Sequence, residues 1–126
     1  MRNVDKHIIH CSDSAFGDAE MIRQWHLERG FKDIGYHFVI RPDGEIEVGR
    51  MMNHVGAHCA KHNTKSIGTC LIGKESFTEK QFRSLRALHK MLKSFYPYIE
   101  LCAHNQFNAY KTCPNFDVHQ EVNRKK

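Results

Sequence analysis

Residues 35–50 read GYHFVIRPDGEIEVGR, and this stretch has the pattern of a β-hairpin. An aromatic and β-branched run at residues 36–40 is typical of a strand, and the Pro-Asp-Gly sequence at residues 42–44 is typical of a turn. A return strand then covers residues 45–48. The hairpin predicts that an antiparallel pair of strands belongs to the sheet of this protein.

Outside the hairpin, short apolar runs alternate with amphipathic segments. They predict strands at residues 6–12, 66–73 and 99–103 and helices at residues 18–30, 77–97 and 116–122. Thr78 and Gln81 have the spacing of a capping box at the start of the second helix. Residues 51–65 have no period and predict a long surface loop. Strands that alternate with helices, together with one hairpin, predict an α/β (mixed α+β) fold in which helices flank a central mixed β-sheet.

The composition is that of one globular domain, residues 1–126. Hydrophobic residues make up 40% of the chain and charged residues 26%. The longest apolar runs, such as HFVI and CLIG, are far shorter than the roughly 20 residues that cross a bilayer, so no membrane insertion is expected. Because Asp5, Lys6 and His7 interrupt the N-terminal segment, we expect synthesis in the cytoplasm without a signal peptide.

The net charge limits the expected class of partner, and the cysteine count limits the expected state of the thiols. The formal net charge of +5 and the pI of about 9.0 favour a polyanionic partner, which is nucleic acid, an anionic cell wall or a membrane surface. No nucleic-acid-binding motif is present, so nucleic acid is not the expected partner. The five cysteines are an odd number without a C-x-x-C pair, which indicates neither a disulfide framework nor a zinc ribbon. Four of them are interpreted as free structural thiols: Cys11, Cys59, Cys70 and Cys102.

Two histidines and a cysteine stand near the ends of predicted strands. His10 lies at the end of the first strand, His104 directly follows the last one, and Cys113 comes nine residues later in an irregular segment. Two imidazoles and a thiolate suit Zn²⁺, and three protein ligands leave a fourth position open, as in catalytic zinc sites. From the spacing alone, packed histidines and a small buried thiol are the better explanation of the same residues.

A series of short motifs follows in a set order along the chain. They are IHCS (9–12), IRQWH (22–26), DIGYHFVIRPDGEIEVGR (33–50), VGAH (55–58), SIGTCLIG (66–73), AH (103–104) and KTCPNFD (111–117). In this order, and over nearly the whole chain, they resemble the zinc-dependent N-acetylmuramoyl-L-alanine amidases of the phage-lysozyme and peptidoglycan-recognition-protein type. The hairpin block is the most specific of these motifs.

The resemblance implies a site as well as a fold. It implies that His10, His104 and Cys113 bind one catalytic zinc ion per chain, in a surface groove at one end of the sheet. It also implies catalytic roles for Tyr36 and Lys111. The segment from His104 to Cys113 is slightly longer than in the phage enzyme, which affects the shape of the loop and leaves the ligand set unchanged.

The implied reaction is hydrolysis of the amide between N-acetylmuramic acid and the L-alanine that starts the stem peptide of peptidoglycan. The chain is then expected to be a phage- or prophage-type endolysin, a monomer that acts on the cell wall by a release route the sequence leaves open. Asn53 and His58, in the irregular segment, are candidate substrate-binding residues, and ordinary exposed polar residues are the alternative interpretation.

Three further residues are expected to have structural roles. His37 should point to the face opposite Tyr36, because side chains alternate along a strand. By the same period Cys11 should face away from His10, and Trp25 should pack with the apolar side of its helix.

Three other functions compete with the amidase. One is a recognition module that binds peptidoglycan without cutting it, which the presence of Cys113 disfavours. The second is a basic nucleic-acid-binding protein, which the charge supports and the motifs do not. The third is a cysteine hydrolase that uses Cys113 with His104, although nothing in the sequence around the thiol favours its activation.

Overall fold

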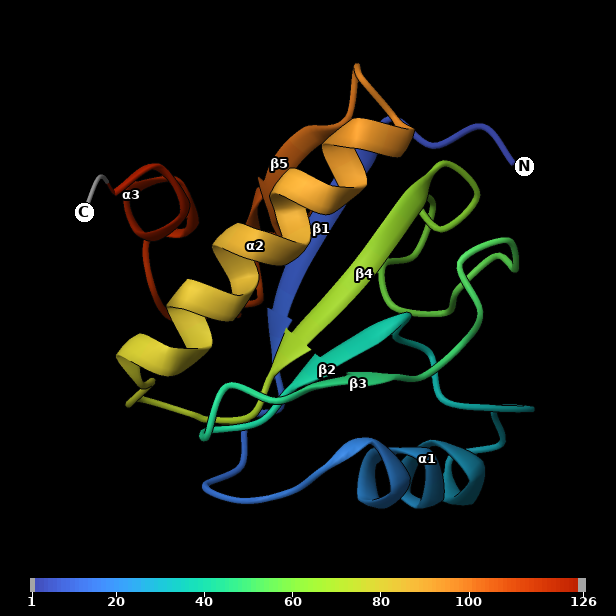
Figure 1. The fold of residues 1–126 in the computed structure, drawn as a ribbon. Helices are drawn as coiled ribbons and strands as arrows, with labels where there is room; N and C mark the ends of the chain where they lie inside the picture. Colours follow the sequence, from blue (N-terminus) through green and yellow to red (C-terminus); the bar gives the residue numbers. More distant parts are fainter. Residues whose placement is uncertain (1, 125–126) are drawn as a thin grey trace.

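The computed structural model describes residues 2–124, which form a five-stranded sheet with helices on both faces (Figure 1). In chain order the elements are β1 (Lys6–Cys11), α1 (Ala19–Glu28), β2 (Phe38–Ile40), β3 (Ile46–Val48), β4 (Ser66–Leu71), α2 (Glu79–Phe95), β5 (Glu100–Ala103), the 3₁₀ turn η1 (His104–Gln106) and α3 (Val118–Asn123). The predicted mixed sheet flanked by helices is confirmed. Within the described residues, no helix combines the length and the apolar character needed to cross a bilayer.

The strands follow the order β3-β2-β4-β1-β5 across the sheet. β1 lies between β4 and β5 and runs parallel to both, and β2 runs parallel to β4. The hairpin partner β3 is antiparallel to β2. Parallel strands in such sheets are buried on both faces and are therefore continuously apolar, which explains why β4 is buried at every residue.

The hairpin forms as predicted, but its first strand is shorter than expected. β2 begins at Phe38 instead of Tyr36. The amides of Gly49 and Arg50, two consecutive residues, donate hydrogen bonds to the carbonyls of His37 and Tyr36. In a regular antiparallel ladder only every second residue bonds to the same neighbour, so these consecutive bonds end the regular pairing. Tyr36 consequently lies in an irregular segment that leads into the strand.

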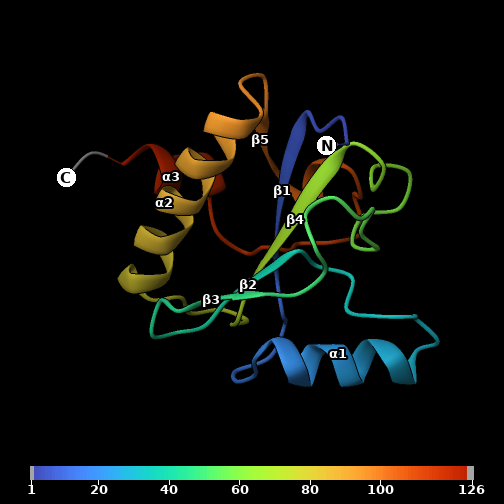
Figure 2. The same ribbon diagram turned by 45° about the vertical axis from the view of Figure 1, so that its right-hand side comes forward.

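The longer helix, α2, lies along one face of the sheet and α1 along the other (Figures 1 and 2). On the α2 face, Leu85 and Leu92 pack in one apolar cluster with Ile40 of β2. On the α1 face, Ile22 packs with Val39 in a second cluster, and Trp25 lies against it as expected. The alternation of Val39 and Ile40 between the two clusters follows from the two-residue period of a strand.

Both helices begin at the residues that the sequence indicated. Asp18 caps α1, because its carboxylate accepts a hydrogen bond from the amide of Met21. Thr78 and Gln81 form the predicted capping box at the start of α2. The short terminal helix is also present as α3, and residues 51–65 form an irregular loop without strand or helix.

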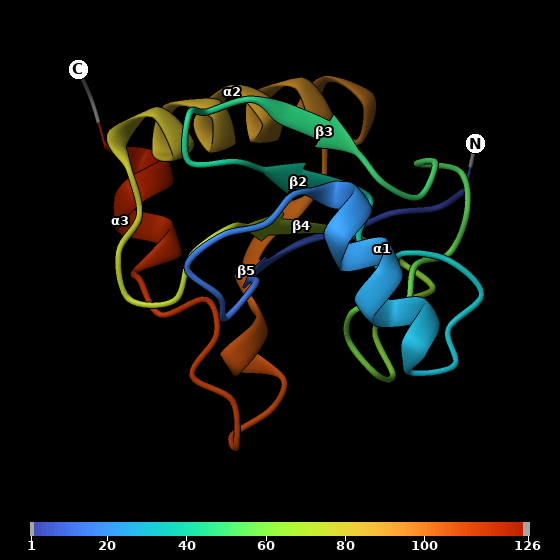
Figure 3. The same ribbon diagram turned by 90° about the horizontal axis from the view of Figure 1, so that it is seen from below.

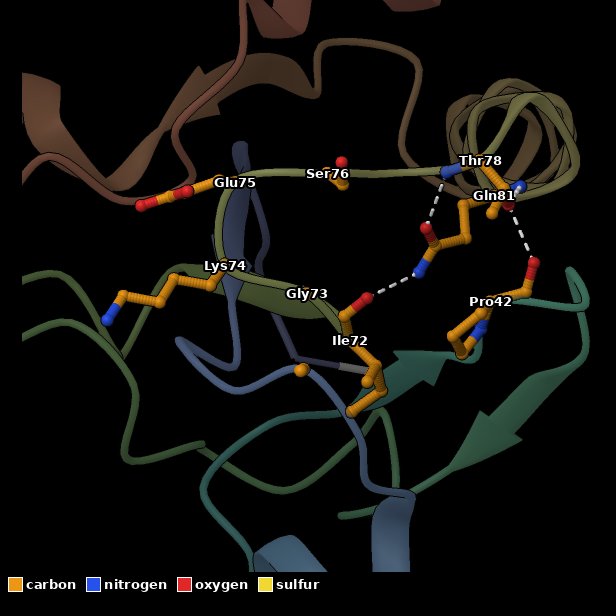
Figure 4. A pocket seen from close by; sticks show the side chains of 9 residues that line it. Pro42, Ile72, Gly73, Lys74, Glu75, Ser76, Thr78 and Gln81 are labelled. Atoms are coloured by element: carbon orange, nitrogen blue, oxygen red, sulfur yellow. Dashed lines mark hydrogen bonds between the residues drawn. The ribbon is translucent and has the colours of Figure 1, made fainter.

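Gln81 connects the start of α2 to the sheet (Figure 4). Its side chain is fully buried, and its amide nitrogen donates to the carbonyl of Ile40 at 3.1 Å and to that of Ile72 at 2.8 Å. Its amide oxygen accepts the N–H of Thr78 at 2.9 Å. These three backbone groups lie where β2, β4 and α2 meet. The carbonyl of Ile40 also accepts the amide of Ile72, whereas the carbonyl of Ile72 and the N–H of Thr78 would lack a partner without this side chain.

We expect Gln81→Leu to destabilise the fold, because it keeps the side-chain volume and leaves two backbone groups at this junction, the carbonyl of Ile72 and the N–H of Thr78, without their partner. A buried group without a partner costs about 1–3 kcal/mol, and the loss here should total roughly 3 kcal/mol of the free energy of unfolding. Urea denaturation measures it. The control is Gln24→Leu on α1, an exposed glutamine whose change should stay within about 0.5 kcal/mol. Equal stabilities of the two variants would contradict this account.

Candidate functional site

The sheet brings two histidines together at one edge. β1 and β5 are parallel neighbours, with Ile9 opposite Ala103, so the residues that follow in each strand, His10 and His104, leave the sheet side by side. Their ring centroids lie 4.4 Å apart. His10 is almost completely buried, at 1% exposure, whereas His104 is half-buried.

Cys113 joins the two histidines from the segment that follows η1. Figure 3 shows this segment leaving the sheet on the side away from α2. It returns to the site because the amide of Asn105 donates to the carbonyl of Cys113 at 3.0 Å, and the amide of Cys11 donates to the Cys113 thiol sulfur at 2.9 Å. As a result, one ligand atom from each of His10, His104 and Cys113 lies within 4.8 Å of the others.

The chemistry of these three groups suits a metal ion. Burial, followed by the nearby His58 and His104, holds the pKa of His10 well below its usual range. Burial and then Lys111 lower the pKa of His104. Both rings are therefore neutral near pH 7, which is the form that ligates metals. Among the described residues, the Nδ1 atom of His104 is buried without a hydrogen-bond partner, so a coordinate bond would satisfy it.

The thiol of Cys113 completes a donor set that matches zinc. Its contact with the Cys11 side chain, followed by burial, raises the pKa of Cys113, so the thiol keeps its proton when no metal is bound. Zinc displaces such a proton on binding, and two imidazoles with one thiolate are among its preferred ligands. The residues present therefore fit a zinc ion with an open fourth position.

His58 holds His10 in place from behind. Its Nδ1 atom lies 2.8 Å from Nε2 of His10, and its Nε2 atom lies 3.1 Å from the hydroxyl oxygen of Ser66. These bonds occupy one ring nitrogen of His10 and leave the other for a metal, an arrangement common around metal-ligating histidines. Gly68 of β4 makes room for the His58 ring, because a Cβ atom at that position would lie 2.5 Å from it.

Tyr36 lies next to His10, with ring centroids 5.0 Å apart. The chain just before it is held by His26 of α1, whose Nδ1 accepts the amide of Gly35 at 2.9 Å. Burial raises the pKa of Tyr36 well above its usual range, so its phenol keeps its proton at neutral pH. Lys111 is exposed in the loop before Cys113 and is close enough to His104 to lower its pKa.

Two adjoining hollows meet at these residues. One has a volume of about 390 Å³ and contains Cys113, and the other has a volume of about 430 Å³ and contains His58. Four residues line both hollows: Arg29, Tyr36, His104 and Lys111. We call the two hollows together the groove. It is the surface groove that the sequence placed at one end of the sheet.

A larger hollow of about 560 Å³, drawn in Figure 4, shares none of its lining residues with the groove. The buried Gln81 amide at its wall already bonds to Thr78, Ile40 and Ile72. It therefore presents no unsatisfied buried amide to a ligand.

The remaining candidate residues fall in different places. His58 lines the groove, yet its ring is engaged with His10 and Ser66. Asn53 is exposed and lines neither hollow of the groove, so the structure does not bring it to the site. His37 is fully buried, and its ring bonds to the amide of Gly68 and the carbonyl of His54, which agrees with a structural place.

Cys11 lies at the site, although only a structural role was expected for it from the sequence. Cys11 lines the groove together with Cys113, and its amide donates to the Cys113 sulfur. A two-residue period describes the faces of a strand and does not describe a loop that covers the strand's end.

The fold and the site together define the class: a mixed α/β enzyme with a His/His/Cys site that can hold a metal ion. The chain belongs to the N-acetylmuramoyl-L-alanine amidase family, whose model matches residues 1–116.

Known proteins agree with this assignment in sequence and in structure. The endolysin of Klebsiella phage KP32 is 42% identical over 87% of this chain and 80% of its own length. The amidase LysC from Clostridium intestinale has a TM-score of 0.89 and 32% identity, covering 98% of this chain and 88% of LysC. A point mutant of Drosophila PGRP-LB, solved in complex with tracheal cytotoxin, has a TM-score of 0.83 and 30% identity, covering 97% of this chain and 81% of its own.

We expect Cys113→Ala to lose metal binding. Changing an outer-shell partner of a metal ligand costs about 10–100-fold in affinity, so removing a ligand should cost at least about 100-fold. Titration of the metal-free protein with Zn²⁺ against a chromogenic chelator measures the affinity. Cys102→Ala is the matched control, because it removes a buried thiol that packs with Ile8 and Cys59 away from the ligand set. Zinc affinity unchanged by Cys113→Ala would contradict the ligand assignment.

Proposed function

We propose that this chain is a zinc-dependent endolysin that cleaves the amide between N-acetylmuramic acid and the L-alanine of the peptidoglycan stem peptide. The observation that carries the proposal is the convergence of His10, His104 and Cys113 within 4.8 Å, beside Tyr36 and Lys111 in one groove. Membership of the amidase family supports the bond that is cut. The solved complex of a related protein with tracheal cytotoxin supports a muropeptide as the occupant of the groove.

His10, His104 and Cys113 would hold one zinc ion per chain. A zinc ion with an open position lowers the pKa of a bound water to about 7 and polarises a carbonyl oxygen. The chain's contribution is to present two neutral imidazoles and a thiol from the ends of two paired strands and one loop. His58 and Ser66 orient the His10 ring toward the site.

Lys111 would stabilise the negative charge that develops on the carbonyl oxygen when the amide is attacked. Its ammonium is exposed at the groove, where a substrate can cover it and so strengthen its interaction with that charge. Tyr36 has its phenol beside His10 in the same groove. It would orient the attacking water or share in stabilising the oxyanion by donating a hydrogen bond.

The proposed cellular role is lysis of the bacterial wall by a monomeric enzyme made in the cytoplasm. The net charge of +5 favours association with an anionic wall. A recognition module that binds without cutting is the alternative. Cys113 disfavours it, because binding alone requires no third metal ligand.

Digestion of purified cell walls tests the proposal directly. The protein should release new free N-terminal alanine, because cleavage converts the amide nitrogen of L-alanine into an amine. A chelator should abolish the release and added Zn²⁺ should restore it, since the site is expected to be inactive without its metal. Binding to walls without release of alanine would favour the recognition module, and release that resists complete metal removal would contradict zinc dependence.

Lys111→Ala should separate catalysis from metal binding. We expect kcat to fall by about 10²–10³, the loss typical of removing one group that stabilises an oxyanion, while zinc affinity stays near that of the wild type. The appearance of N-terminal alanine in digested walls measures kcat, and the chelator titration measures zinc affinity. Lys90→Ala on α2 removes an exposed lysine outside the groove and should leave both values unchanged. Undiminished kcat in Lys111→Ala would exclude the proposed role.

A further inference from the structure

Arg29 lies at the groove, and neither the metal binding nor the proposed catalysis involves it. It caps the C-terminal end of α1 and lines both hollows, together with Tyr36, His104 and Lys111. The Arg29 side chain is exposed, and within residues 2–124 its guanidinium forms neither an ion pair nor a hydrogen bond. By contrast, Arg23 on the same helix is paired with Asp33 and Glu20. The Arg29 guanidinium therefore keeps its donors available to a ligand.

An aromatic ring holds the Arg29 guanidinium at the rim of the groove. Its central carbon lies 5.2 Å from the centroid of the Phe31 ring, which is a cation–π contact. The Phe31 ring in turn packs on His26 of α1, with centroids 4.9 Å apart. The N–H donors of the guanidinium have no hydrogen-bond partner within the described residues, and their fork geometry matches the two oxygens of a carboxylate.

The charge of the groove favours an anion at this position. Its lining carries two permanent cations, Arg29 and Lys111, and a single acidic side chain, Asp13. Asp13 lines only the hollow that contains Cys113, so the hollow that contains Phe31 has cations and no carboxylate. An incoming carboxylate would meet uncompensated positive charge there.

The stem peptide offers such a carboxylate close to the scissile bond. In bacterial stem peptides, L-alanine is followed by a D-glutamate joined through its γ-carboxyl, which leaves the α-carboxyl either free or as the amide of D-isoglutamine. The free form is the first anion along the stem after the amide that is cut. Arg29 lines the same two hollows as Tyr36 and Lys111, the residues proposed to act on that amide, so the first anion beyond it is the candidate for this guanidinium.

We propose that Arg29 is a specificity-determining residue that binds the free α-carboxylate of the second stem residue and so selects walls in which this group is not amidated. The inference rests on the proposed amidase function. A bidentate, partly desolvated contact between a guanidinium and a carboxylate should favour the acid over the amide about tenfold in kcat/KM.

The test compares two soluble muropeptides that differ only in the acid or the amide at the second stem residue. The zinc-loaded full chain is assayed for release of the alanine amine, and each muropeptide is also assayed as a competitor of wall digestion, which reports binding whether or not it is cleaved. Wild-type protein should prefer the acid about tenfold, and Arg29→Gln should reduce the preference to about twofold or less. The change should appear in the KM, or in the inhibition constant, of the acid muropeptide. Arg29→Lys, which keeps the charge without the fork, should show an intermediate preference.

Two controls separate selection of the carboxylate from general charge attraction and from a structural role of Arg29. Arg83→Gln on α2 removes the same charge from an exposed arginine outside the groove, so it corrects for general attraction between a basic protein and an anionic substrate. Thermal unfolding of Arg29→Gln shows whether the helix end is intact, and a purely structural role would change both muropeptides equally.

Equal handling of acid and amide by the wild type, or a preference that survives Arg29→Gln, would overturn the inference and leave the amidase in place. Protein that releases alanine from neither walls nor muropeptides would overturn the proposed function instead.

Discussion

Parallel pairing of β1 with β5 is the constraint on which the site depends. Parallel neighbours end at the same edge of a sheet, so two histidines more than ninety positions apart in sequence leave the sheet with their rings 4.4 Å apart. β4 secures this arrangement from the other side, because it pairs with all six residues of β1. The third ligand, Cys113, can come from a loop because hydrogen bonds from Asn105 and Cys11 tie that loop to the ends of the same two strands.

The buried histidines have to be neutral, and their ring nitrogens need hydrogen-bond partners. A charged imidazole in the interior is costly, and burial holds the pKa of His58 at about 3 and that of His37 at about 4. Each neutral ring still needs partners for its nitrogens, which the described residues supply: Ser66 and His10 for His58, and backbone groups of Gly68 and His54 for His37. Among the imidazole nitrogens of the described residues, the buried one without a partner is Nδ1 of His104 at the candidate metal site. The rings around the site therefore form a neutral, hydrogen-bonded support, and its exception lies where a coordinate bond is expected.

Much of this could be predicted from the sequence, because the hairpin, the capping box and the strand ends depend on local patterns. The shortened start of β2 could not, since it follows from consecutive bonds between Tyr36, His37 and a distant pair of amides. The support of His10 by His58 was also out of reach, because it requires a strand residue without a side chain, Gly68, beneath the ring. The place of Cys11 beside Cys113 was out of reach for a related reason: the strand period says nothing about the loop that carries Cys113.

The groove separates the candidate metal ligands from the two exposed cations that we propose to meet the substrate. His10 is buried on β1, and the half-buried His104 and Cys113 are tied to the ends of β5 and β1, where a change of position would disturb the sheet. The latter, Lys111 and Arg29, are exposed at a loop and a helix end, where a change costs little stability. Exposed cations interact weakly while water surrounds them, and their effect grows when a substrate displaces that water. Helix-end and loop positions can therefore alter which stem peptide is accepted while the ligands, and with them the bond that is cut, stay the same.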